Sequence, residues 1–125
     1  LEAVEGRAGL KTELRVVGEG RLLPHVEEGL YRIAVEALNN TLRHAQAGSI
    51  SVILRLEPRT AILEVIDDGI GFDPALVQKA GGLGLRGMAE RAEQLEGMLM
   101  VDSQPGTGTW IRAVVPKVEQ QEVPR

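Results

Sequence analysis

The chain has 125 residues, enough for one domain with a single hydrophobic core. Hydrophobic residues make up 43% and charged residues 26%, a composition that is typical of a soluble globular domain and excludes a disordered chain. A net charge of −4, no basic run, and only one Trp, one Tyr and one Phe exclude a nucleic-acid backbone as main partner and a surface that stacks on bases.

The first predicted element is a strand that ends before Gly18. Leu10, Thr12, Leu14 and Val16 alternate with charged residues, which is the pattern of a strand with one face in water. Glycines then interrupt the alternation.

The longest predicted element is a helix from Pro24 to about Ala45. Proline is favoured in the first turn of a helix, where its missing N–H would have no partner. An apolar stripe follows at helical spacing. It consists of Val26, Leu30, Ala34, Ala37, Leu38, Thr41 and Leu42.

The rest of the chain predicts two strand pairs and a second helix. Apolar alternation on both sides of residues 57–60 indicates a hairpin, and a similar pattern on both sides of residues 103–108 indicates a final strand pair. Between them, a helix is expected from near Leu85 to a C-terminal glycine, Gly97.

These elements predict an α+β fold. Most neighbouring strands are joined by hairpins, which favours a two-layer sandwich with a mixed, mostly antiparallel sheet and helices on one face. We expect one domain over residues 1–116 and a polar, flexible tail over residues 117–125. Phe72 and Trp110 are expected in the core.

The long helix carries a polar edge. Glu36, Asn40 and Arg43 are spaced so that they fall within a narrow wedge on one face. Such an edge can be an ordinary solvated helix face. However, Asn39 and Asn40 are poor residues for a helix interior, and an amide oxygen beside a carboxylate suits a hard cation such as Mg²⁺.

Asp67, Gly69 and Gly71 form a second motif, directly after an apolar strand. A carboxylate at a strand end can accept a hydrogen bond from an exocyclic amine, and the glycines let a ligand approach the backbone. The alternative is a simple turn, because Asp and Gly are common turn residues.

Gly82, Gly84 and Leu85 form a third motif at the start of a predicted helix. Free N–H groups at a helix start can bind phosphate, although a glycine hinge would look the same. The run from Gly82 to Gly87 also matches a dinucleotide-binding pattern, but the strand and the parallel sheet that this pattern requires are missing.

In this order the motifs resemble the nucleotide-binding boxes of histidine kinase ATPase domains. That family shares its Bergerat-type fold with type II topoisomerases, mismatch-repair ATPases and heat-shock chaperones. The resemblance runs from Leu10 to Pro116, and the short interval between the second and third motifs is similar to a subfamily with a reduced ATP lid. The matching segments are EALNNTLRHA (36–45), DDGIGFD (67–73), GLGLRGM (82–88) and GTGT (106–109).

The resemblance implies that the domain binds Mg-ATP, with ATP and Mg²⁺ as its cofactors. Asn40 would coordinate the Mg²⁺ on the triphosphate, Glu36 would position or deprotonate the attacking group, and Arg43 would face the phosphates. Lid and phosphate contacts are implied for Gly82, Gly84 and Leu85.

The second motif would hold the base. Asp67 would bind the adenine amino group, Gly69 and Gly71 would shape the pocket, and Thr109 would complete the adenine hydrogen-bond network.

The implied reaction transfers the γ-phosphoryl group of ATP to a histidine in two-component signalling. Family members carry that histidine on a preceding dimerisation helix, so the implied partners are these phosphoacceptor helices and a downstream response regulator. The isolated domain is expected to be a monomer that does not autophosphorylate. Two alternatives stay open, namely a free-standing serine kinase of the anti-sigma-factor type and a module that binds nucleotide only for regulation.

A cytoplasmic location is expected. The chain has no cysteine, which suits a reducing compartment, and no apolar stretch approaches the roughly 18 residues of a membrane helix. We therefore expect no membrane contact by this domain, and we leave open a membrane anchor elsewhere in a parent protein.

Overall fold

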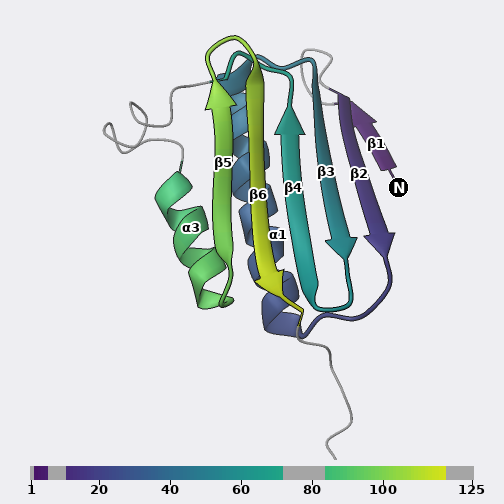
Figure 1. Ribbon diagram of the computed structural model, residues 1–125. Coiled ribbons are helices and arrows are strands. Elements are labelled where there is room, and N and C mark those ends of the chain that lie inside the picture. Colours follow the sequence, from purple (N-terminus) through teal and green to yellow (C-terminus); the bar gives the residue numbers. More distant parts are fainter. Residues whose placement is uncertain (1, 6–10, 72–83, 118–125) are drawn as a thin grey trace, which may run out of the picture.

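A six-stranded sheet with helices on one face forms the fold (Figure 1). The structure is a computed structural model that describes residues 2–5, 11–71 and 84–117. Its elements are β1 (Glu2–Glu5), β2 (Lys11–Gly18), α1 (Pro24–Asn40), the π-helical turn η2 (Thr41–Ala45), β3 (Ser49–Leu56), β4 (Thr60–Asp67), α3 (Leu85–Gln94), β5 (Met98–Gln104) and β6 (Gly108–Pro116).

The strands follow the order β1-β2-β3-β4-β6-β5. Four of the five pairings are antiparallel, and β2 with β3 is parallel because α1 connects them as a crossover. The predicted α+β class and the mostly antiparallel sheet are confirmed. The sequence did not indicate β1, which is too short to show an alternating pattern.

The core lies between the sheet and the two helices, and its fully buried side chains are mainly aliphatic. Helices α1 and α3 pack closely where Gly29 meets Leu95. A Cβ atom at Gly29 would lie 2.8 Å from Cδ1 of Leu95, so the glycine makes room for the second helix. This contact explains a residue that costs about 1 kcal/mol of helix stability relative to Ala.

The predicted apolar stripe on α1 is right for Val26, Leu30 and Ala37, which are buried, but wrong for Leu42. Leu42 is 55% exposed because the α-helix gives way to a π-helical turn at Thr41, where the spacing of 3.6 residues per turn ends. Ile33, which the predicted stripe left out, is fully buried.

Helix α3 ends in a Schellman motif whose left-handed residue is Glu96 (φ 62°), not the predicted Gly97. The N–H of Glu96 donates to the carbonyl of Glu93, and the N–H of Gly97 donates to that of Ala92. Gly97 serves a different purpose, since a Cβ atom there would lie 2.1 Å from the carbonyl oxygen of Val114.

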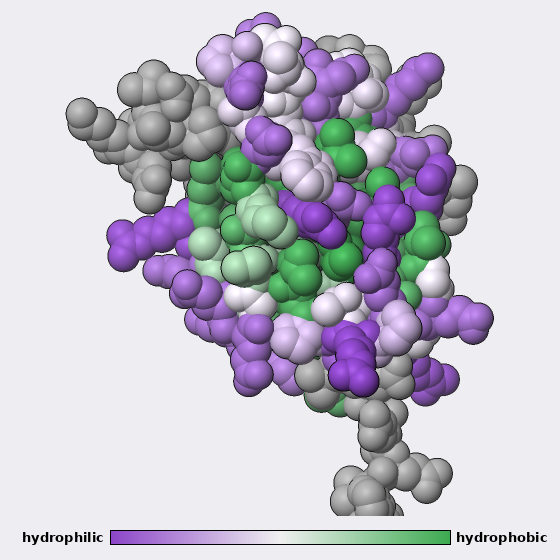
Figure 2. Space-filling model, in the orientation of Figure 1, coloured by the Kyte–Doolittle hydropathy of each residue, from purple (hydrophilic) through white to green (hydrophobic). Residues whose placement is uncertain are grey.

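The open face of the sheet carries a polar cluster instead of a helix layer (Figures 1 and 2). Glu64 is 9% exposed and accepts hydrogen bonds from Arg55 (2.9 Å) and from the indole N–H of Trp110 (3.1 Å). The guanidinium of Arg112 lies 5.8 Å from the centre of the Trp110 ring. Trp110 was predicted to lie in the core, but it is only partly buried and lies on the open face. Phe72 lies outside the described residues.

Apolar side chains surround this cluster. Figure 2 shows them gathered on the open face, with charged residues among and around them. The exposed ones near the cluster include Ile66, Met98 and Met100.

The C-terminal end of the domain is anchored through Lys117. Its N–H donates to the carbonyl of Arg59, and its ammonium group donates to the carbonyl of Glu19. The rest of the predicted tail, residues 118–125, lies outside the described part of the chain. No helix among the described residues has the length and apolar character needed to cross a membrane.

The Glu64 cluster predicts an acid-sensitive contribution to stability. The hydrogen bond from Arg55, with help from Trp110, lowers the pKa of Glu64, so the carboxylate stabilises the fold at neutral pH and this stabilisation disappears as the pH falls through the folded-state pKa. Glu64→Gln should lower the free energy of unfolding by about 1–3 kcal/mol at pH 7. The difference from the unsubstituted protein should shrink in acid, as measured by urea unfolding across pH.

Glu93→Gln is the matched control, because Glu93 is exposed on α3. It should change the free energy of unfolding by less than about 0.5 kcal/mol at each pH. A Glu64→Gln effect that stays constant with pH would contradict the assignment.

Candidate functional site

The predicted site residues gather at one end of the sandwich. The end of α1, the end of β4 and the β5–β6 hairpin lie at the upper edge in Figure 1, and α3 begins below them in the upper half of the domain. Segments from the four sequence motifs therefore meet at this end, within the described residues.

The polar edge of α1 forms as predicted. The carboxylate of Glu36 lies 3.9 Å from the guanidinium of Arg43, and the Nε of Arg43 donates to the carbonyl of Asn39 (3.4 Å). Asn40 is the last residue of α1 and is half-buried, whereas Asn39 is exposed. The two asparagines thus occupy different environments, and Asn40 lies on the side that faces the protein.

A buried hydrogen bond joins the end of α1 to the end of β4. The hydroxyl of Thr41 donates to Oδ2 of Asp67 at 3.0 Å, and both residues are less than 9% exposed. Because Asn40 directly precedes Thr41, this bond brings the polar edge of the helix next to the acid. The sequence placed Thr41 only in the apolar stripe, and the one available signal was a hydroxyl among aliphatic residues.

The second oxygen of Asp67 and its cross-strand neighbour complete this part of the site. Oδ1 of Asp67 accepts the N–H of Gly69 at 2.8 Å. Thr109 lies directly opposite Asp67 in the β4–β6 pair, is buried, and has its hydroxyl 2.9 Å from that of Ser103. The two residues that the resemblance assigned to adenine are therefore neighbours on adjacent strands, and Ser103 is a partner of Thr109 that the sequence did not indicate.

Two glycines let the loop after β4 pack against the hairpin. Gly71 has φ +67°, and a Cβ atom there would lie 2.1 Å from the carbonyl oxygen of Gln104. Gly108 has φ +93°, and a Cβ atom there would lie 2.3 Å from the carbonyl oxygen of Asp67. Only glycine fits at either position, because both the backbone angle and the space exclude a side chain.

Asp68 has a role different from that of Asp67. Its carboxylate accepts the N–H groups of Gly48 and Ser49, both at 2.9 Å, and the hydroxyl of Ser49 at 3.0 Å. These bonds, first of all the one from the Ser49 backbone, lower the pKa of Asp68. Asp68, which is exposed, thus connects the end of β4 to the start of β3. The carboxylate of Asp67, which is buried, makes none of these contacts.

The start of α3 lies beside Glu36. A Cβ atom at Gly84 (φ +62°) would lie 2.9 Å from Oε2 of Glu36. The N–H groups in the first turn of a helix have no intrahelical acceptor, and no side chain caps the start of α3. Leu85 packs against the core. These features are compatible with the predicted phosphate contact, while Gly82 lies outside the described residues.

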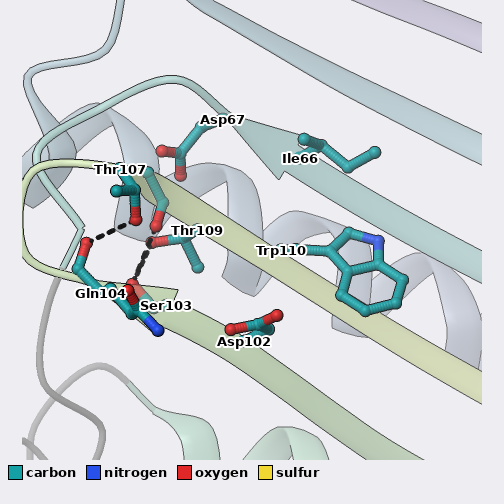
Figure 3. A pocket seen from close by; sticks show the side chains of 9 residues that line it. Ile66, Asp67, Asp102, Ser103, Gln104, Thr107, Thr109 and Trp110 are labelled. Carbon is teal, nitrogen blue, oxygen red and sulfur yellow. Dashed lines mark hydrogen bonds between the residues drawn. The ribbon is translucent and has the colours of Figure 1, made fainter.

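A hollow of about 350 Å³ lies at the same end of the sheet (Figure 3). Side chains alternate between the two faces of a strand, so Ile66, Asp102 and Trp110 belong to the open face, whereas Asp67 and Thr109 belong to the helix face. Of the predicted nucleotide contacts, Asp67 and Thr109 line this hollow, whereas Glu36 and Asn40 do not.

The described residues include no group of three or more His, Cys, Asp or Glu side chains arranged to hold a metal ion. A divalent cation at this end would therefore need most of its ligands from a bound phosphate chain and from water. Mg²⁺ sites commonly have this composition, with one or two protein oxygens. The amide oxygen of Asn40, one helical turn from the carboxylate of Glu36, fits such a site chemically.

Comparison with known proteins agrees with this geometry. Residues 25–119 match the family described as histidine kinase-, DNA gyrase B- and HSP90-like ATPases. The chain is 38% identical over 112 residues to the signal transduction histidine-protein kinase/phosphatase DegS of Bacillus subtilis (strain 168), and the match covers 86% of this chain and 29% of that protein. It is 43% identical over 91 residues to the oxygen sensor histidine kinase NreB of Staphylococcus carnosus (strain TM300), covering 73% and 26%.

A solved structure shows the same fold. The histidine kinase domain of the blue-light activated histidine kinase from Erythrobacter litoralis EL346 has a TM-score of 0.72 and 25% sequence identity, over 90% of this chain and 54% of that one. The chain spans less than a third of the length of either curated relative.

The glycine contacts predict a contrast between two alanine substitutions. Gly71→Ala should lower the free energy of unfolding by about 2–4 kcal/mol, because it adds overpacking to backbone strain. Gly106 has a similar φ of +88° but nothing within 4 Å of an added Cβ atom, so Gly106→Ala should cost only about 1 kcal/mol. Thermal or urea unfolding measures both, and equal costs would contradict the close approach of Gly71 to the hairpin.

Proposed function

Because the chain belongs to the family of histidine kinase-, DNA gyrase B- and HSP90-like ATPases, we propose that it is the ATP-binding catalytic domain of a sensor histidine kinase. The observation that carries this proposal is the hydrogen bond from Thr41 to Asp67, which brings the polar end of α1 beside the buried acid. A single ligand could then contact the acid through its base and the helix through its phosphates.

The base would bind at Asp67 and Thr109. A carboxylate has about four acceptor positions, and two of those on Asp67 are used by Thr41 and Gly69. The remaining capacity would accept the exocyclic amino group of adenine. Guanine has a carbonyl oxygen at the same ring position, which would face the carboxylate and be repelled, so adenine should be preferred.

The phosphates would bind between α1 and the start of α3. Arg43 would supply positive charge, and the free N–H groups at Gly84 and Leu85 would donate to phosphate oxygens. Asn40 would be the protein ligand of Mg²⁺, which supplies charge neutralisation on the triphosphate when it is bound. Gly82 is proposed for the same region from the sequence alone.

The reaction would be phosphoryl transfer from ATP to a histidine outside this chain. The bond between the γ-phosphorus and the β–γ bridging oxygen of ATP would break, and ADP would leave with that oxygen. A bond from the γ-phosphorus to an imidazole nitrogen would form, and Glu36 would orient the imidazole or accept its proton. Catalysis of this kind depends mainly on positioning and charge neutralisation. The proximity of Gly84 to Glu36 supports this role, because it places the proposed phosphate contacts beside the proposed base.

The proposed partners follow from the proposed reaction. They are the dimerisation helices that carry the acceptor histidine and a response regulator that receives the phosphoryl group afterwards. The relatives are named histidine kinases, which favours a histidine acceptor over the serine acceptor of an anti-sigma-factor-type kinase and over a purely regulatory role. We also propose a cytoplasmic location, which the use of ATP favours.

Alanine substitution of Asn40 and, as a control, of Asn39 tests whether Asn40 binds the Mg²⁺ ion that accompanies ATP. Asn40→Ala should weaken ATP binding about tenfold in Mg²⁺, the loss expected when one ligand is removed, and should have little effect without Mg²⁺. Asn39→Ala, which removes an exposed amide from the same helix, is the control and should leave both affinities unchanged. Isothermal calorimetry measures all four combinations, and similar behaviour of the two variants would contradict the role of Asn40.

The acceptor can be identified by the acid stability of the product. Labelled ATP mixed with this domain and a separately supplied phosphoacceptor domain should produce phosphohistidine, whose phosphorus–nitrogen bond is lost in acid and retained in alkali. Glu36→Gln should slow the transfer by about 10²–10⁴-fold while retaining ATP binding. An acid-stable product would instead identify a serine kinase, and labelling that never exceeds background would favour the regulatory module.

A further inference from the structure

Thr41 has a role that the sequence motifs did not assign. We propose that Thr41 is a positioning residue that determines the selectivity of the site for adenine by holding the carboxylate of Asp67. This inference rests on the proposed function, because it requires that Asp67 contacts the base.

The hydroxyl of Thr41 is directed at the acid instead of at its own helix. A threonine in a helix commonly donates to the carbonyl four residues earlier, which here belongs to Ala37. That carbonyl already accepts the backbone N–H of Thr41, as does the carbonyl of Leu38. The side chain of Thr41 instead donates to Oδ2 of Asp67, 26 positions further along the chain, at 3.0 Å.

Burial makes this hydrogen bond consequential. Thr41 is 4% exposed and Asp67 is 8% exposed, so bulk water cannot readily replace the hydroxyl. A buried carboxylate that loses a donor has a large desolvation cost, and hydrogen bonds to charged groups are stronger than neutral ones. The hydroxyl is therefore one of the groups that satisfy the buried carboxylate of Asp67.

Two donors define the orientation of the carboxylate. The N–H of Gly69 binds Oδ1 at 2.8 Å and the hydroxyl of Thr41 binds Oδ2, so each oxygen is held by one donor. The terminal torsion of Asp has a broad energy profile, and one donor alone would leave the group free to rotate. With both donors, the remaining acceptor positions have a fixed direction toward the site.

The place of Thr41 in the chain connects both ends of the proposed ligand. Thr41 is the first residue of the π-helical turn, a geometry that is frequent at functional sites, and it directly follows Asn40. One residue of α1 would thus contact the metal and phosphate end, and the next residue orients the acid for the base. The exocyclic amine distinguishes adenine from other purines, so loss of the hydroxyl should affect base selectivity more than phosphate binding.

Thr41→Val tests this inference, because valine has nearly the shape of threonine but no hydroxyl. Calorimetry should compare ATP with purine riboside triphosphate, which lacks only the 6-amino group. Thr41→Val should weaken ATP binding about tenfold and change binding of the analogue less than about twofold. Thr41→Ser restores the hydroxyl and should keep the ATP preference within about twofold of the unsubstituted protein, and Thr41→Ala replaces the valine variant if that variant does not fold.

The outcomes separate this inference from the proposed function. If the unsubstituted protein binds ATP and the analogue equally well, the adenine contact of Asp67 is wrong, and this inference is overturned with it. If the unsubstituted protein prefers ATP and Thr41→Val retains the same preference, only the role of Thr41 is overturned. Equal losses for both nucleotides would show a merely structural role and would also overturn the inference.

Discussion

The buried carboxylate of Asp67 is the constraint on which the geometry of the candidate site depends. A charged group removed from water must be satisfied by donors of the protein, or it destabilises the fold. Here the donors are Thr41 at the end of α1 and Gly69 in the loop after β4. Satisfying one side chain therefore determines where the helix ends relative to the sheet and how the loop leaves β4.

Close backbone contacts reinforce this arrangement. Gly71 lets the loop after β4 lie against the β5–β6 hairpin, and Gly108 lets β6 approach the backbone of Asp67. Asp68, directly after Asp67, connects β4 to β3 through three hydrogen bonds. The two neighbouring acids thus differ in role, because Asp67 lies in the candidate site and Asp68 connects the strands that support it.

The two faces of the sheet are stabilised in different ways. The core on the helix face lies under α1 and α3 and is almost wholly aliphatic apart from the residues around Asp67, whereas Leu14 and Val16 of β2 stay exposed. The open face has no helix among the described elements and covers its centre with a cluster of its own, in which Arg55 and Trp110 satisfy Glu64. A hydrophobic core on one side and a hydrogen-bonded polar cluster on the other therefore stabilise the same strands.

The sequence alone determined the α+β class and the order of the main elements, and it indicated the motifs of the candidate site, because alternation, helical spacing and turn residues are local properties. Only the tertiary structure decided that Thr41 reaches Asp67, that Trp110 lies on the open face and that Leu42 is exposed. The first two facts depend on side chains 26 and 46 positions apart in the chain, and the third depends on a π-helical turn. Local sequence patterns carry no information about partners so far apart in the chain, and only the packing of the folded chain brings them into contact.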